Sequence, residues 1–94
     1  MFLVELFVPM NVRGADIEEL VEALAVRFGG ATAHVRSPAD GLWHDRSLEK
    51  EPIGIIEVMT ADFDRDWWRT LREDLEERFN QTEILIRATP CEKI

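Results

Sequence analysis

The sequence predicts an α+β sandwich of the ferredoxin-like type, with element order βαββαβ and both helices on one face of a four-stranded antiparallel sheet. The first observation is an internal repeat, because residues 20–36 align without a gap to residues 71–87. The second is that each copy has the pattern of an amphipathic helix followed by a strand, with an apolar strand-like run before it. Two split βαβ units assemble most simply with strand order 4-1-3-2. The alternative exchanges an edge strand between subunits.

The length of 94 residues predicts one domain, residues 1–94, with a single core. Within it, the repeat relates residues 2–36 to residues 53–87. Residues 37–52 are the one long irregular stretch, because two prolines and a glycine interrupt them.

The first half begins with a strand at residues 2–8, which are rich in β-branched and aromatic side chains. Asp16 is expected to cap the helix that follows, with Glu19 completing a capping box. Gly29-Gly30 predicts the end of this helix, and residues 31–36 predict the second strand. The apolar stripe of the helix consists of Ile17, Leu20, Val21, Leu24 and Phe28.

The second half repeats this plan with a strand at residues 53–60, a helix and a strand at residues 82–88. Either Asp62 or Asp64 is expected to cap the helix, which should end at Asn80-Gln81. Its buried stripe is predicted to consist of Trp68, Leu71, Leu75 and Phe79.

Charge, hydropathy and cysteine content argue against several kinds of partner and favour one location. The net charge is −8 and the basic residues form no run, which argues against nucleic acid. No apolar run approaches the length of a membrane span, so no membrane association is expected. The single cysteine, Cys91, cannot form an internal disulfide and favours a cytoplasmic location.

Strand alternation predicts that one face of the sheet is not covered by the helices. We call this surface the open face. It combines large apolar side chains with ionisable ones, and such a surface is seldom left uncovered on a monomer. Its predicted members are Leu3, Glu5, Phe7, His34, Arg36, Ile55, Glu57, Met59, Leu85 and Arg87.

The ionisable members of the open face allow two interpretations. Glu5 and Glu57 occupy equivalent positions on the two central strands, and Arg36 and Arg87 are equivalents on the outer strands. In the first interpretation, two structural Glu–Arg pairs satisfy one another. In the second, Glu5, Glu57 and His34 are candidate acid–base groups on an apolar floor.

Arg36, Arg87, Phe7 and Trp43 are the candidate ligand-binding residues. The arginines would anchor an anion, and Trp43 in the long loop is expected to fold over the sheet as a lid. Neither the spacing of His34, His44 and Asp45 nor any other motif predicts a metal site, and no cofactor is expected.

Three sequence motifs carry a resemblance to a known family. They are RFGG before a strand, GLW in the central loop, and RFNQTEILIRATP near the end. With these motifs the chain resembles a family of short, uncharacterised bacterial proteins, and no catalytic residue comes with that resemblance. At the level of the fold it is similar to the dimeric α+β barrel proteins, in which two sheets pack face to face.

The function expected from these observations is a homodimeric ligand-binding or regulatory module that uses the open face, with a small molecule as a possible ligand. The alternative is a small cofactor-free enzyme of the oxygenase, isomerase or lyase type. A cavity against the open face favours binding or catalysis, whereas a dry interface favours a structural dimer.

Overall fold

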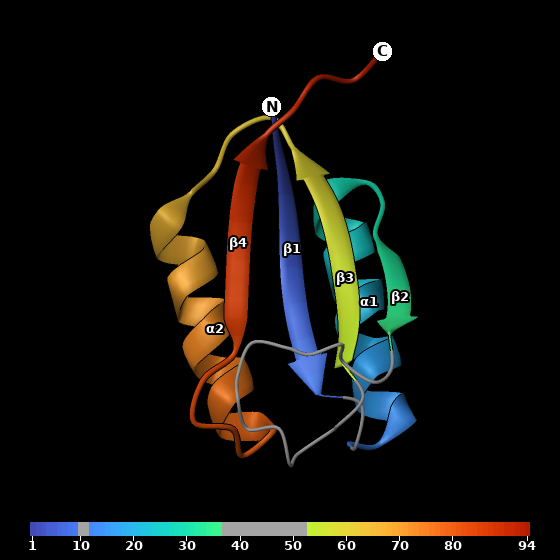
Figure 1. Cartoon of the computed structure of the whole chain (residues 1–94), viewed down its shortest axis with the longest axis vertical. Helices are drawn as coiled ribbons and strands as arrows, with labels where there is room; N and C mark the ends of the chain where they lie inside the picture. The colour runs from blue at the N-terminus through green and yellow to red at the C-terminus, as the bar shows by residue number, and fades with distance from the viewer. Residues whose placement is uncertain (10–11, 37–52) are drawn as a thin grey trace.

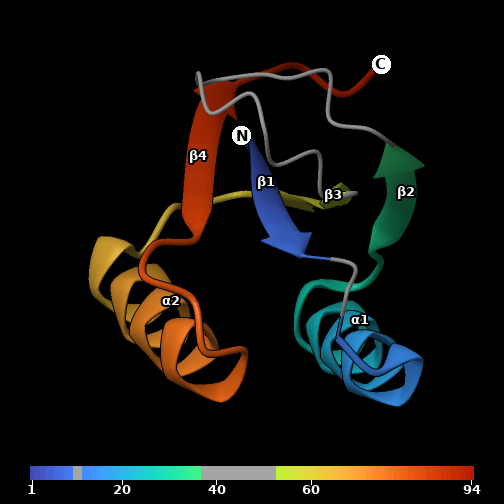
Figure 2. The same cartoon turned by 60° about the horizontal axis from the view of Figure 1, so that its bottom comes forward.

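Four antiparallel strands form one sheet, and both helices lie on the same side of it (Figures 1 and 2). The computed structural model describes residues 1–9, 12–36 and 53–94. The observed strand order β2-β3-β1-β4 is the predicted order 4-1-3-2, so the predicted fold class is confirmed. The elements are β1 (Phe2–Pro9), α1 (Gly14–Phe28), β2 (Thr32–Arg36), β3 (Ile53–Thr60), α2 (Arg65–Arg78) and β4 (Leu85–Pro90).

The helix ends follow the predicted chemistry in three of four cases. Gly29 ends α1 in the left-handed conformation with φ 87°, and Asp64 caps α2 by accepting a hydrogen bond from the Trp67 N–H at 3.2 Å. Asn80, with φ 55°, follows α2 at the position equivalent to Gly29. The prediction for the start of α1 was wrong. The N-cap is Arg13 without a side-chain cap, and Asp16 instead lies in the first turn, where it pairs with Arg13 at 3.3 Å.

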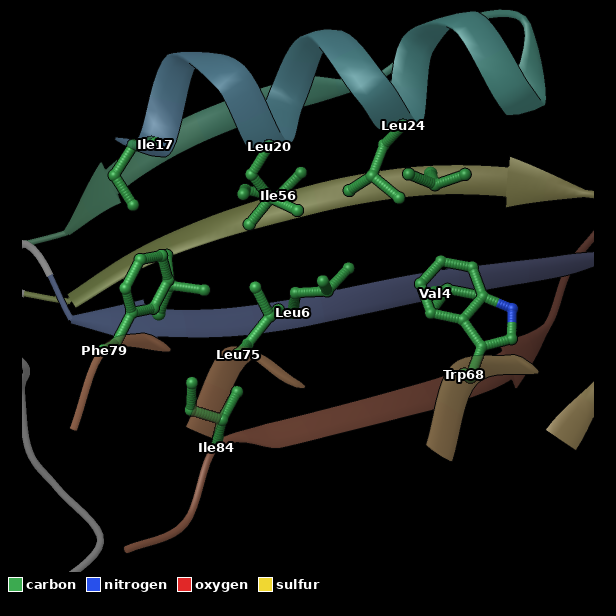
Figure 3. Packing of buried hydrophobic residues seen from close by; sticks show 12 residues of the cluster. Val4, Leu6, Ile17, Leu20, Leu24, Ile56, Trp68, Leu75, Phe79 and Ile84 are labelled. Atoms are coloured by element: carbon green, nitrogen blue, oxygen red, sulfur yellow. The ribbon is translucent and has the colours of Figure 1, made fainter. Parts of the chain in front are cut away.

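The core lies between the helices and the covered face of the sheet (Figure 3). Alternate residues of the central strands point into it, as the strand alternation predicted. The buried stripes of the two helices meet them from one side. The buried apolar residues are Val4, Leu6, Val8, Ile17, Leu20, Leu24, Ile56, Val58, Trp68, Leu75, Phe79 and Ile84. Leu71 is only partly buried.

The final strand begins at Leu85 rather than at the predicted residue 82. The backbone N–H of Ile84 donates to the Oε2 of Glu76 at 2.9 Å, so a helix side chain takes this donor before the strand starts. From Leu85 onward β4 pairs with β1, and the ladder continues past its end because the Cys91 N–H donates to the Met1 carbonyl at 3.0 Å.

Candidate functional site

A row of polar side chains crosses the open face at the middle of the sheet. Glu5 on β1 and Glu57 on β3 are direct partners in the central ladder. Arg87 on β4 is the partner of Glu5, and Thr32 on β2 is the partner of Glu57. Like charges placed directly opposite each other destabilise a sheet unless other groups compensate them. Each carboxylate therefore needs a partner from an outer strand.

Arg87 compensates Glu5. Its Nε lies 2.7 Å from the Glu5 Oε1, and its guanidinium also lies over the Phe7 ring, 5.1 Å from the centroid. The Glu5 side chain is only 14% exposed, so this charge-assisted bond lies in a partly desolvated setting. Three predicted site residues are thereby brought together on β1 and β4.

His34 is the partner of the second carboxylate. The cross-strand neighbour of His34 is Ile55, and the imidazole reaches diagonally so that its Nε2 lies 3.3 Å from the Glu57 Oε1. This contact is an ion pair only when the imidazole is protonated. The Glu57 side chain is 34% exposed, which leaves it more accessible than Glu5.

The interpretation with two equivalent Glu–Arg pairs agrees with the contact between Arg87 and Glu5, whereas the described partner of Glu57 is His34. The register of Arg87 with Glu5 would place Arg36 opposite Glu57, but Arg36 is the Cα partner of Ile53. The strand β2 is thus shifted by four residues relative to the arrangement of β4. The Arg36 side chain and the whole of Trp43, His44 and Asp45 lie outside the described residues.

An open hollow of about 730 Å³ lies beside the row, at the end of the sheet where β2 starts. The short turn from α1 to β2, residues 29–31, forms one wall. The last residues of β3, from Glu57 onward, form another, and Leu3 on β1 adds an apolar wall. Because β2 pairs with β3 only as far as Glu57, the end of β3 is left beside this hollow without β2 next to it.

Two basic side chains line the hollow, and the sequence reasoning missed both. They are Arg27 at the end of α1 and Lys93 near the C-terminus. Arg27 lies over the Trp67 ring, 4.2 Å from the centroid. The sequence held one signal for Arg27. Its equivalent in the second copy, Arg78, has an acidic residue four positions earlier, Asp74, with which it can pair on the helix, whereas the residue four positions before Arg27 is Ala23.

The described part of the chain holds no group of three His, Cys, Asp or Glu side chains that could bind a metal ion. In the same residues, neither helix has the length and apolar character needed to span a bilayer. Comparisons with protein-family models, with curated proteins and with solved structures gave no match. The site is therefore interpreted from its own chemistry.

Proposed function

We propose that this chain is a small homodimeric ligand-binding module, and that two copies associate through the open face. One observation carries the proposal: the apolar side chains of this face surround carboxylates that already have partners within one copy. Leu3, Phe7 and Ile55 are half-buried, and Met59 and Leu85 are more exposed. A continuous apolar group on several neighbouring strands is typical of an association surface.

The distribution of charge favours a second copy as the partner. The helices α1 and α2 carry nine acidic and five basic residues between them, and the chain has a net charge of −8. Two copies that meet through their helices would repel each other. On the open face, by contrast, the two carboxylates are compensated by Arg87 and, when it is protonated, by His34. Association through this face therefore joins the least acidic surfaces.

The two-fold symmetry of such a dimer brings the polar row of one copy near the row of the other. The internal partners of Glu5 and Glu57 reduce the repulsion that four carboxylates would otherwise cause. The hollow beside the row would then lie at the margin of the interface. We assign the dimer to the cytoplasm because its single cysteine, Cys91, cannot form an internal disulfide and suits a reducing compartment.

Sedimentation velocity tests the proposal, with variants that alter one surface at a time. Leu85→Glu places a charge among the apolar residues of the open face, and we expect it to weaken the dimer at least about tenfold. Val26→Glu is the matched control, because Val26 is 83% exposed on α1 and its equivalent in the second copy is Glu77. A wild-type monomer at micromolar concentration contradicts the proposal, as does dissociation by Val26→Glu alone.

The contact between His34 and Glu57 favours one second candidate, a cofactor-free enzyme that moves a proton. The two groups lie 3.3 Å apart, and Glu57 also lines the hollow. If this candidate is right, the protein should exchange the C3 protons of 2-oxo acids, which are adjacent to the keto group, with D2O, as followed by proton NMR. Glu57→Gln should abolish the exchange while Glu5→Gln retains it. Equal rates with and without protein would exclude proton abstraction from these acids.

A further inference from the structure

We infer that the hollow beside β3 binds an organic anion, namely a carboxylate attached to an apolar body. This inference deepens the proposed ligand-binding function and rests on it. The hollow itself is formed within one copy of the chain, so binding can be measured whether or not two copies associate. Its volume of about 730 Å³ lies within the range of small-molecule sites.

The basic side chains of the hollow are the first argument. The chain is strongly acidic, and five of the seven arginines with described side chains pair with carboxylates. Among the described residues, the basic side chains without a carboxylate partner are Arg27, Arg65 and Lys93. Two of these three, Arg27 and Lys93, line the same hollow. An anion that enters the hollow would supply the carboxylate partner that neither side chain has among the described residues.

The position of the guanidinium is the second argument. Arg27 is held over Trp67 at 4.2 Å and lies 5.4 Å from the Phe28 centroid. These contacts restrict the side chain while leaving its N–H donors able to bind a carboxylate. Because Arg27 is already partly ordered before binding, less conformational entropy is lost when it binds an anion, and association costs less free energy.

The remaining walls define the rest of the ligand. Leu3, Phe28 and Met59 provide apolar surface for a hydrocarbon body. Glu57 lies at the sheet side of the hollow, and it repels an anion toward Arg27 and Lys93. The carbonyl end of α1 carries a partial negative charge of about half a unit, which is smaller than the two positive charges opposing it. The site therefore orients an amphipathic anion.

Nuclear magnetic resonance titration tests this inference with octanoate and its neutral counterpart octanamide. We expect octanoate to bind with a dissociation constant on the order of 1 mM and to shift the Gly29 and Gly30 amide resonances. Octanamide should bind at least about tenfold more weakly, because it lacks the charge that Arg27 and Lys93 recognise.

Variants locate the binding site. Arg27→Gln should weaken octanoate binding about tenfold, and Lys93→Gln should also weaken it. Arg65→Gln is the matched control, since Arg65 also lies over an aromatic ring, that of Phe63 at 5.6 Å, but does not line the hollow. Thermal unfolding of each variant checks that the fold is retained.

Three results would overturn the inference: equal affinity for octanamide and octanoate, equal weakening by Arg65→Gln, or no shift at Gly29 and Gly30. Sedimentation of the same samples separates this outcome from failure of the dimer. A monomer that binds octanoate through Arg27 contradicts only the proposed association, whereas a dimer without binding contradicts only the anion site.

Discussion

The helices in the two halves of this chain both end at an Arg-Phe pair, but the two pairs differ in burial and in their contacts. In the second half, Phe79 is buried in the core, and Arg78 pairs with Asp74 and Glu19, at 3.5 Å in each case. In the first half, Phe28 is only partly buried, and Arg27 lines the hollow. The same motif is thus packed into the core at one end of the molecule and lies beside the open hollow at the other.

The connections after the helices explain much of this difference. Three residues, Gly29–Ala31, separate α1 from β2, whereas six residues, Phe79–Ile84, separate α2 from β4. The longer connection buries Phe79 and Ile84 against the core. The shorter one lets β2 start at Thr32, opposite Glu57, which produces the shifted register and the hollow beside it.

The largest effect should come from the phenylalanines. Phe79→Ala removes a buried ring and should lower the free energy of unfolding by about 3–5 kcal/mol. Phe28→Ala removes a partly exposed ring and should cost about half as much or less. Urea denaturation of both variants measures the difference. Equal losses of unfolding free energy would contradict the difference in burial between Phe79 and Phe28.

The next largest effect should come from Glu76, whose equivalent in the first half is Ala25. Glu76→Ala leaves the Ile84 N–H without its 2.9 Å acceptor, and we expect a loss of about 1–3 kcal/mol. Glu77→Ala is the control, since Glu77 is an exposed neighbour on the same helix. If both variants unfold at the same urea concentration, the contact from α2 to the start of β4 is not important for stability.

A smaller effect is expected at Gly29, the left-handed residue that ends α1. Gly29→Ala forces a β-carbon onto a φ of 87° and should cost about 1 kcal/mol. Gly30→Ala should be neutral or stabilising by up to about 1 kcal/mol, because an added β-carbon meets no atom within 4 Å and its φ is not left-handed. Thermal unfolding compares the neighbours directly; a larger loss at Gly30 would contradict the assigned cap.

The smallest effect should come from the arginines. Arg78→Gln removes two exposed ion pairs and should cost about 0.2–1 kcal/mol at low salt, with less effect at high salt. Arg27→Gln has no such pair to lose among the described residues, so its small cost should change little with salt. A salt series of urea denaturation curves for both variants gives the comparison. Similar salt dependence would indicate that Arg27 has a carboxylate partner after all.

Much of the fold could be predicted because the hydrophobic patterns of the helices and central strands are strong. The buried positions Val4, Leu6 and Leu75 follow directly from the two periods of alternation. The composition of the open face followed from the same alternation. The partner of Glu57 could not be predicted, because strand alternation leaves the pairing register of the outer strands open. That register depends on the lengths of the connections after the helices, and the gapless repeat alignment does not show that these lengths differ. Arg27 and Lys93 were missed because only the fold brings these distant positions together.

The early start of β2 also has a consequence for aggregation. Within the described residues, β2 leaves only Val58–Thr60 of β3 beyond its ladder, so the edge of β3 that β2 does not pair is three residues long. Edges this short are poor templates for adding strands from other molecules. Polymerisation along this edge is therefore disfavoured even though the neighbouring surface is apolar. A deletion within α1–β2 that exposed more of β3 would convert the same place into a nucleus for fibrils.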